Sequence, residues 1–320
     1  MAIMIALFAL VIGALILGYG ADLFVDGASH MARRFGISTV VIGLTVVAFG
    51  TSAPEMAVNV LAAIDGKSDI AMGNVVGSNI FNILIVLGVC ATLKALMVSS
   101  QLTKIDIPLM AVSSVLLWWF AFDGAIQKWE GAVLTVLVVA YTALQVFLSK
   151  REKSKAIVEE SNKEFSDSAP AWKNILFLIG GLALLIGGAR MFVYGAVEIA
   201  RVLGMSEQVI ALTIVAAGTS LPELAASVAA TLKGELEIAI GNVVGSNIFN
   251  ILAVLGLSGI LSPTDIISDQ AMTNIDIPLM ILASLLMAPL ARFRGKFERP
   301  VGILFVLSYA GYVIHLLGRA

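Results

Sequence analysis

Charged side chains are scarce in this chain of 320 residues, because only 13% of the residues are Asp, Glu, Lys or Arg while 59% are hydrophobic. An average soluble domain carries about 25% charged residues, so water is not the main solvent of this protein. The formal net charge of −2 offers neither a basic surface for nucleic acid nor a strongly acidic tail. The composition therefore indicates a membrane protein whose surroundings are the lipid bilayer, with no nucleic-acid partner and no obligatory protein partner evident.

Cysteine and histidine are also nearly absent. The single cysteine, Cys90, lies in an apolar run, which excludes an internal disulfide and suggests a packing residue. His30 and His315 have no cysteine or carboxylate companions at metal-binding spacing, and the chain contains no phosphate-binding loop and no nucleophilic triad. We therefore expect no enzyme and no cofactor.

Long apolar runs fill the rest of the chain. The first begins without a preceding Lys or Arg, so it lacks the basic start of a secretory signal peptide and reads as a retained membrane span. Ten runs are each long enough to cross a bilayer, near residues 3–20, 38–64, 70–93, 105–122, 130–149, 173–194, 208–232, 237–261, 275–291 and 300–317. The predicted fold class is an all-α membrane protein with ten transmembrane helices.

One polar stretch, residues 150–172, separates residues 1–149 from residues 173–320. It is too short for a folded domain and reads as a linker between two halves of five spans. Loops on the linker's side hold 15 of the 20 Lys and Arg residues, and such an excess marks the cytoplasmic side. We expect a multi-pass protein of the cell membrane with a cytoplasmic linker and both termini outside. Because five is odd, the halves then enter the membrane in opposite directions.

The two halves share an internal repeat. Residues 43–88 match residues 211–256, with roughly 30 of 46 positions identical, and the run GNVVGSNIFNIL recurs unchanged from Gly73 and from Gly241. Weaker similarity reaches back to Gly13 and Gly181. The repeated positions are polar or helix-disturbing residues, which hydrocarbon penalises, so duplication of a mere scaffold does not explain them. Such inverted repeats are typical of secondary transporters, whose sites lie where the halves meet.

The first repeated element is GTSAPE, residues 50–55, matched by GTSLPE, residues 218–223. Pro54 and Pro222 each remove a helical hydrogen bond, so we expect breaks there. Backbone carbonyls near Ala48 to Thr51, and near Ala216 to Thr219, are then available as ligands. Non-helical backbone at membrane depth is tolerated only where it is buried in protein or lines a cavity.

Glu55 and Glu223 follow these breaks directly. An ionised carboxylate at that depth costs several kcal/mol unless it is paired, and the repeat cores hold no basic residue except Lys67 and Lys233 in loops. The natural partner is a bound cation. Two carboxylates match one Ca²⁺, which prefers six to eight oxygen ligands, and Na⁺ ions are able to use the same oxygens.

The second repeated element is GSNIFN, residues 77–82 and 245–250. Ser78 and Asn82 are four residues apart and share a helix face, as do Ser246 and Asn250, so we expect all four to offer oxygens to the site. Asn79 and Asn247 lie beside that face and are expected to cap or bridge helices. The glycines repeat the spacing that lets helices approach closely.

Several acidic residues lie outside the repeats. Asp106 and Asp276 precede prolines and are expected to cap helices at the membrane surface. Asp22, Asp26 and Glu198 flank the first and sixth spans, where they face an access pathway or, as the preferred interpretation, are solvated end residues.

Together, these paired GTS-x-PE and GN-x-x-GSN elements resemble the alpha-repeats of the sodium/calcium exchangers within the calcium/cation antiporter superfamily, and the compact prokaryotic members above all. The resemblance covers nearly the whole chain. It implies ten helices, a central cluster of ion sites, and first and sixth spans that slide as a gate. By position it implies Ca²⁺ ligands at Glu55 and Glu223 with the carbonyls of Thr51 and Thr219. The implied Na⁺ ligands are Ala48, Ser52, Ser78, Asn82, Ala216, Ser220, Ser246 and Asn250.

Two departures from relatives bear on function. Some relatives, including those that cotransport potassium, carry aspartate where this chain has Asn250, which argues against a potassium requirement. The linker is too short for the calcium-sensing domains of animal exchangers.

The sequence thus predicts a secondary antiporter that exchanges Ca²⁺ for Na⁺ by alternating access. A Ca²⁺/H⁺ or broader cation/proton antiporter stays open at this point, and a gated cation channel is a third alternative. Hydroxyl and carbonyl oxygens favour Na⁺, because a proton needs no coordination shell.

Overall fold

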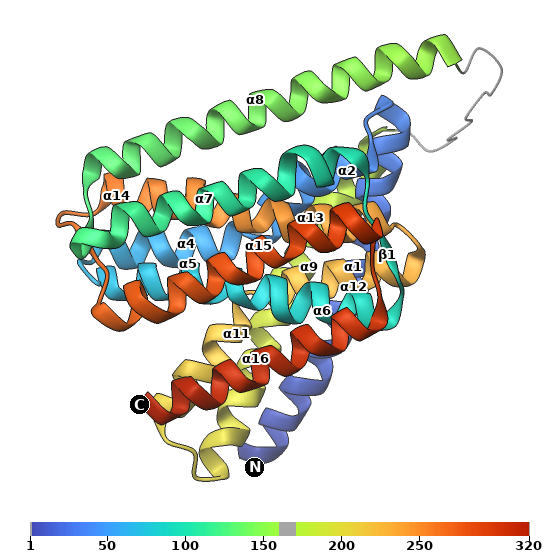
Figure 1. Ribbon diagram of the computed structural model, residues 1–320. Helices are drawn as coiled ribbons and strands as arrows, with labels where there is room; N and C mark the ends of the chain where they lie inside the picture. The colour runs from blue at the N-terminus through green and yellow to red at the C-terminus, as the bar shows by residue number, and fades with distance from the viewer. Residues whose placement is uncertain (1, 160–170, 320) are drawn as a thin grey trace.

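The computed structural model describes residues 2–159 and 171–319, and nearly all of them are helical (Figure 1). The first half contains α1 (Ala2–Phe35), α2 (Thr39–Ile42), η1 (Gly43–Val47), α3 (Ala48–Thr51), α4 (Ala53–Ile64), α5 (Ser68–Phe81), η2 (Asn82–Leu87), α6 (Gly88–Leu93), η3 (Leu102–Asp106), α7 (Ile107–Phe120), η4 (Ala121–Asp123) and α8 (Lys128–Glu159). The second contains α9 (Ala171–Val202), α10 (Glu207–Ile210), η5 (Ala211–Val215), α11 (Ala216–Gly218), α12 (Leu221–Lys233), α13 (Leu236–Phe249), η6 (Asn250–Leu255), α14 (Gly256–Leu261), η7 (Met272–Asp276), α15 (Ile277–Arg294) and α16 (Arg299–Arg319).

The all-helical membrane architecture is confirmed. Within the described residues, eight helices are long and apolar enough to cross a bilayer, and the bent pair Thr39–Thr51 and Ala53–Ile64 brings the number to nine. The span from Leu236 to Leu261 is 100% buried and that from Ile70 to Leu93 is 78% buried, whereas the spans of α1 and α16 are only 22% and 17% buried. The centre of the molecule is therefore built from α5, α13 and their continuations.

Wide helical turns recur at matched places in both halves. The π-helices η1, η2 and η3 correspond to η5, η6 and η7, and each begins 168 or 170 residues before its counterpart. A π-helical turn shifts the hydrogen-bond register of a helix by one residue and is frequent at functional sites. The hydrophobic periodicity of the sequence does not reveal these turns.

The predicted proline breaks are present. Ser52 and Ser220 both leave the helical conformation, with φ/ψ of −81°/0° and −94°/8°. Pro54 and Pro222 then fall in the first turn of α4 and α12, where the missing N–H costs little. In the first half, the helix axis turns by 47° at this break.

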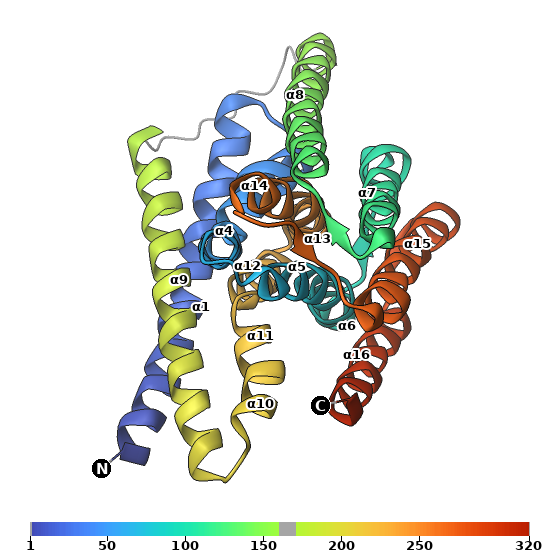
Figure 2. The same ribbon diagram turned by 90° about the vertical axis from the view of Figure 1, so that its left-hand side faces the viewer.

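The long helices α1 and α9 form a separate pair. In Figure 2 they run vertically side by side, while α4, α5, α13 and α14 are seen nearly end-on. Glycines allow the close contact, because a Cβ at Gly13 would lie 2.5 Å from the nitrogen of Phe192 and a Cβ at Gly181 2.5 Å from that of Phe24. Since 13 + 168 = 181 and 24 + 168 = 192, the two contacts are the same contact with the roles of the halves exchanged.

Two short strand pairs join the halves. Strand β1 (Leu96–Met97) pairs antiparallel with β4 (Lys296–Phe297), and β2 (Ala125–Ile126) pairs antiparallel with β3 (Ile266–Ile267). A shift of 170 residues carries β1 onto β3 and β2 onto β4, so the two pairings are also related by exchange of the halves. These two-residue strands are the described exception to an all-α chain.

The helix before the linker is longer than the apolar run near residues 130–149. It continues to Glu159, because Lys, Glu and Ala in this stretch are good helix formers even though they are too polar for hydrocarbon. Residues 160–170 of the predicted linker lie outside the described part of the chain.

Candidate cation site

Glu55 and Glu223 lie in the first turns of α4 and α12 and are 1% and 0% exposed. Each accepts a hydrogen bond from the serine that precedes the other half's proline. Ser52 donates to Glu223 Oε1 at 2.9 Å, and Ser220 donates to Glu55 Oε1 at 3.1 Å. The two motifs that are 168 residues apart in the sequence therefore meet as one reciprocal unit.

The second oxygen of each carboxylate is unused by the protein. Glu55 Oε2 and Glu223 Oε2 are both buried and accept no hydrogen bond, and no Lys, Arg or His of the described residues forms an ion pair with either glutamate. A buried carboxylate is costly without a positive partner. The geometry therefore suits a cation held between the two glutamates.

Thr51 and Thr219 end the helices that precede the breaks. Their hydroxyls reach across to the other half, where Thr51 donates to Asn242 Oδ1 at 3.1 Å and Thr219 donates to Asn74 Oδ1 at 3.3 Å. Asn242 also donates to the backbone oxygen of Glu223 at 3.3 Å. With the hydroxyls engaged, the backbone oxygens are the ligand atoms that these threonines offer.

Asn74 and Asn242 were not singled out as site residues from the sequence. The signal was present, since both belong to the run that recurs unchanged, yet a motif alone does not tell an anchor from a packing residue.

The polar residues of α5, η2, α13 and η6 lie at the same centre. Ser78, Asn82, Ser246 and Asn250 are between 0% and 2% exposed. Ser78 Oγ, Asn82 Oδ1 and Asn250 Oδ1 have no hydrogen-bond partner, whereas Ser246 Oγ lies 3.5 Å from the carbonyl of Ala48. These oxygens add neutral ligands to the two carboxylates.

Asn79 and Asn247 bridge helices of the two halves, as expected. Asn79 lies within hydrogen-bond distance of the backbone oxygen of Asn247, at 3.4 Å. Each amide also contacts a methionine sulfur of the opposite half at 3.5 Å, Asn79 at Met280 and Asn247 at Met110.

Ala48 and Ala216 begin α3 and α11. The carbonyl of Ala48 is not released by the break, because it accepts the N–H of Ser52 at 3.0 Å. A carbonyl oxygen has two lone pairs, so this bond leaves one for a ligand.

A cavity of about 320 Å³ reaches the site between α4, α9 and the start of α12. Its lining includes Arg190 and Tyr194 of α9 together with Thr219 and Pro222 beside Glu223. Arg190 and Tyr194 are exposed, so the cavity connects the surface with the buried glutamates. It lies at the end of the molecule where α4 terminates near Asp65, opposite the linker.

One expectation outside the repeats is wrong. Asp106 does not cap a helix at the surface but is fully buried, with no capping hydrogen bond to the backbone. It accepts hydrogen bonds from Gln145 at 2.6 Å, Gln101 at 3.1 Å and Tyr141 at 3.3 Å. Since α8 supplies Gln145 and Tyr141, this carboxylate fastens α8 to the bundle.

The flanking acidic residues prove to be paired. Asp22 and Asp26 both meet Lys233, and Glu198 pairs with Arg201 on its own helix at 2.6 Å. A helix end in a membrane protein is solvated, yet packing against a neighbouring loop still supplies it with partners.

The fold and the site define a multispan membrane protein with an oxygen-lined cation site at the contact of two homologous halves. The family is shown by comparison, because the model of the sodium/calcium exchanger protein family matches residues 5–147 and 173–318. The chain belongs to this family and is an antiporter of the sodium/calcium exchanger type, not an enzyme.

Similar proteins cover nearly the full chain. CaxA of Alkalimonas amylolytica, assigned provisionally as an antiporter, is 41% identical over 97% of this chain and 98% of its own length. The sodium/calcium exchanger MaX1 of Methanosarcina acetivorans is 34% identical over 96% of this chain and 97% of its own. Among solved structures, the sodium-calcium exchanger NCX_Mj soaked with Na⁺ and Sr²⁺ superposes with a TM-score of 0.84 and 32% identity, over 98% of each chain.

Proposed function

We propose that this protein exchanges Ca²⁺ for Na⁺ across the cell membrane by alternating access, with Glu55 and Glu223 as the ligands that both ions share. The observation that carries the proposal is the reciprocal pair of buried carboxylates, each hydrogen-bonded on one oxygen and unpartnered on the other. The charge of −2 that they hold when ionised is matched by one Ca²⁺ or by Na⁺ ions.

The proposed ligand set follows the oxygens around this pair. For Ca²⁺ it consists of the two carboxylates with the backbone carbonyls of Thr51 and Thr219. For Na⁺ it adds Ala48, Ser52, Ser78, Asn82 and their counterparts Ala216, Ser220, Ser246 and Asn250. Hard cations prefer such carboxylate, carbonyl, hydroxyl and amide oxygens.

Coupling follows from charge. The site cannot readily cross the membrane while two buried carboxylates lack a counter-charge. It crosses when Ca²⁺ or Na⁺ neutralises them, so the gradient of one ion drives the other. An inward Na⁺ gradient then extrudes Ca²⁺.

Na⁺ is favoured over H⁺ as the counter-ion by the surroundings of the carboxylates. Neutral oxygens of Ser78, Asn82 and Asn250 are buried beside them without partners, and a proton would need none of these. MaX1 carries the name of a sodium/calcium exchanger, and NCX_Mj was solved after soaking with Na⁺ and Ca²⁺.

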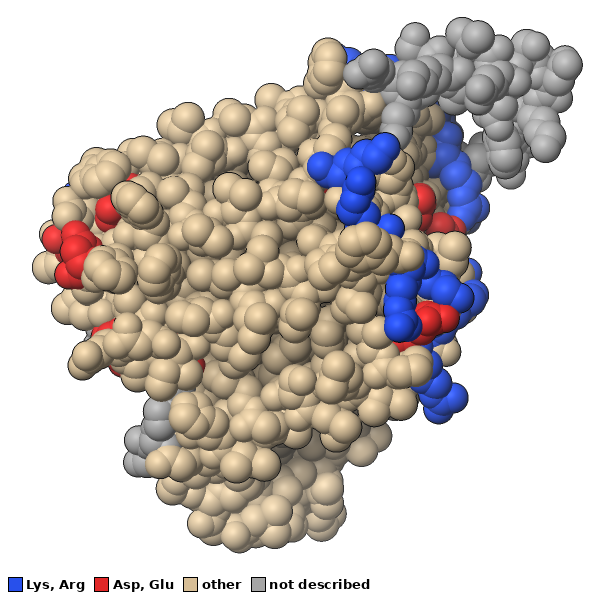
Figure 3. All heavy atoms as spheres, in the orientation of Figure 1, with Lys and Arg blue, Asp and Glu red and all other residues tan. Residues whose placement is uncertain are grey.

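Ten spans in two inverted halves, residues 1–149 and 173–320, complete the proposal. The tenth span is the broken helix from α10 to α12, which corresponds to the bent pair of the first half. Basic side chains gather beside the linker at one end of the molecule, while acidic ones gather at the other end (Figure 3). By the excess of Lys and Arg in cytoplasmic loops, the linker is cytoplasmic and both termini are outside.

The test is uptake of ⁴⁵Ca²⁺ into proteoliposomes that contain Na⁺, compared with proteoliposomes that carry only a pH gradient. We expect uptake with the Na⁺ gradient and none with the pH gradient alone. Uptake that follows pH and ignores Na⁺ would overturn Na⁺ coupling and establish the proton antiporter instead.

The site is tested by Glu55→Gln and Glu223→Gln, which remove a charge without changing the size of the side chain. Each should abolish exchange while the purified protein keeps its elution volume and cooperative thermal unfolding. Asp123→Asn, at an exposed acidic residue of the turn before α8, is the matched control and should exchange normally. Full activity in either glutamine variant would refute the shared-carboxylate site.

A further inference from the structure

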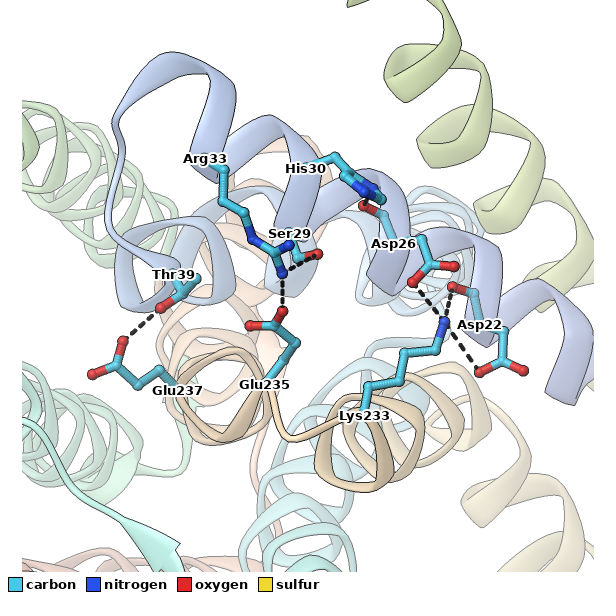
Figure 4. Close-up of polar contacts among 9 residues, drawn as sticks. All are labelled: Asp22, Asp26, Ser29, His30, Arg33, Thr39, Lys233, Glu235 and Glu237. Atoms are coloured by element: carbon cyan, nitrogen blue, oxygen red, sulfur yellow. Dashed lines mark hydrogen bonds and ion pairs between the residues drawn. The ribbon is translucent and has the colours of Figure 1, made fainter. Parts of the chain in front are cut away.

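At the linker end of the molecule, ion pairs tie α1 to the turn between α12 and α13 (Figure 4). Lys233 Nζ lies 2.6 Å from Asp26 Oδ1 and 3.5 Å from Asp22 Oδ1, and it also donates to the backbone oxygen of Asp22 at 3.0 Å. Arg33 forms an ion pair with Glu235 of the same turn. The α1–α9 pair is thereby fastened to the second half on the linker side.

The repeat relates this cluster to a second set of residues at the other end. A shift of 168 residues carries Asp22 onto Arg190 and Asp26 onto Tyr194 in α9, and it carries Asp65, at the end of α4, onto Lys233. The signs of both charges are exchanged, so the two sets remain complementary. The register of this shift is fixed by the exchanged glycine contacts of Gly13 and Gly181 between α1 and α9.

The second set is not joined in this structure. Asp65 and Arg190 are both exposed, and neither forms an ion pair with another residue in the described part of the chain. Arg190 and Tyr194 line the cavity that leads to Glu223. The end with the joined set is closed over by these contacts, and the end with the separated set has the cavity.

A buried amide pair follows the same rule independently. Asn242 donates to Ser227 Oγ at 2.9 Å in the second half. The corresponding residues of the first half are Asn74 and Asn59, and Asn74 Nδ2 and Asn59 Oδ1 are both buried without a hydrogen-bond partner. The first half thus holds a donor and an acceptor that are unused in this conformation.

We propose that Asp65 pairs with Arg190, and Asn59 with Asn74, when the protein opens toward the linker, and that the contacts of Lys233 with Asp22 and Asp26 break in the same step. This inference rests on the proposed alternating access. The residues touch no transported ion, so they act as positioning residues that set the balance between the two conformations.

The two closures are of unequal strength. Arg33 and Glu235 correspond to Arg201 and Lys67, which are both positive, so the second ion pair of the linker side has no attractive counterpart at the other end. The conformation closed on the linker side is therefore favoured in the absence of ions. The population should shift when Lys233 loses its positive charge.

Cross-linking tests the exchange of contacts directly. In a Cys90→Ala background, the outer pair is Asp65→Cys with Arg190→Cys and the inner pair is Asp26→Cys with Lys233→Cys. A short bifunctional thiol reagent is used, because a disulfide requires Cα atoms about 4.4–6.8 Å apart and an Asp–Arg pair is longer. The two pairs are studied in full-length protein in lipid, with each single-cysteine variant as a control.

The inner pair should cross-link readily in the resting protein and the outer pair poorly. Adding Lys233→Glu to the outer pair should raise its cross-linking yield, because the reversed charge would repel Asp22 and Asp26. The proposal is overturned if the outer pair fails to cross-link in this background while the inner pair cross-links normally. Absence of Ca²⁺ exchange by the wild-type protein would overturn the proposed function instead, since cross-linking reports geometry alone.

Charge exchange separates pairing from local structure. Asp65→Arg and Arg190→Asp should each slow Ca²⁺ exchange by about two- to fivefold, the range that an exposed ion pair supports, and the double variant should recover the wild-type rate. Lys128→Glu, an exposed charge reversal at the start of α8, should have no effect. A double variant no better than the single ones would contradict the pair.

Discussion

Ser52 of the first half donates a hydrogen bond to Glu223 of the second, with the hydroxyl oxygen 2.9 Å from Oε1. The equivalent bond from Ser220 to Glu55, at 3.1 Å, makes each carboxylate depend on the opposite half for its position. The site exists only where the halves meet, so a relative movement of the halves changes its shape. This dependence is the physical basis for coupling ion binding to movement.

Removing either hydroxyl should weaken ion binding. A hydrogen bond to a charged group contributes about 1.5–3 kcal/mol, and about 1.4 kcal/mol corresponds to a tenfold change in a binding constant. Ser52→Ala and Ser220→Ala should therefore each raise the Ca²⁺ concentration for half-maximal exchange about tenfold, as measured in proteoliposomes. Ser114→Ala removes a buried hydroxyl that lies 3.4 Å from Ser284, away from the site, and should leave this concentration unchanged.

Removal of Ca²⁺ should lower thermal stability. A ligand that binds only the folded state stabilises it by about 2.7 kcal/mol at a concentration of 100 times its Kd. In detergent without Na⁺, chelation should therefore lower the Tm of the wild-type protein, and Na⁺ should restore part of the difference. Glu55→Gln and Glu223→Gln should show the same Tm with and without Ca²⁺, and a Ca²⁺-dependent Tm in both would place the binding elsewhere.

The close packing of α1 on α9 should be intolerant of a single methyl group. In Gly13→Ala and Gly181→Ala the added Cβ would lie 2.5 Å from a backbone nitrogen, and such overpacking costs about 1–3 kcal/mol. Gly18→Ala and Gly180→Ala add the same methyl to the same helices where no described atom lies within 4 Å. Thermal unfolding should show a lower Tm for the first two variants and no decrease for the two controls.

The sequence is most informative where one physical requirement determines the residue. Apolar runs predict the spans, Pro54 and Pro222 predict the breaks, and two carboxylates without a basic neighbour predict a cation. The repeat predicts which residues are equivalent. Each of these inferences needs only the local chain and the penalty that hydrocarbon imposes on polar groups.

Contacts between distant segments are less accessible to such reasoning. Asp106 looks like a helix cap because aspartate before proline usually is one, but its partners Gln101 and Gln145 come from segments whose proximity only the fold determines. Lys233 and Asp26 are likewise separated by 207 residues. The π-helices escape detection because they insert a wide turn without changing the hydrophobic composition.

The buried Asp106 should support stability and not transport. Asp106→Ala would leave the donors of Gln101, Gln145 and Tyr141 without their acceptor, and each unsatisfied buried group costs about 1–3 kcal/mol. We expect a clearly lower Tm with an unchanged Ca²⁺ concentration for half-maximal exchange. An unchanged Tm together with a changed ion response would instead assign Asp106 to the ion pathway.

Asn250 should make the exchange independent of potassium. Its side chain is fully buried, donates to Asn79 Oδ1 at 3.2 Å and leaves Oδ1 unpartnered, so it offers the site a neutral oxygen. Replacing K⁺ by choline should therefore leave wild-type Ca²⁺ exchange unchanged. Asn250→Asp adds a third buried negative charge that needs a further cation, and K⁺ should now stimulate exchange.

Asn250→Ala controls for loss of the amide bond to Asn79, because it removes the same hydrogen bond without adding a charge. It should exchange more slowly than the wild-type protein and stay insensitive to K⁺. Stimulation of the wild-type protein by K⁺ would contradict the neutral role of Asn250, because the existing carboxylates would then already hold an additional cation. Stimulation of both variants alike would trace the effect to the lost hydrogen bond instead of the added charge.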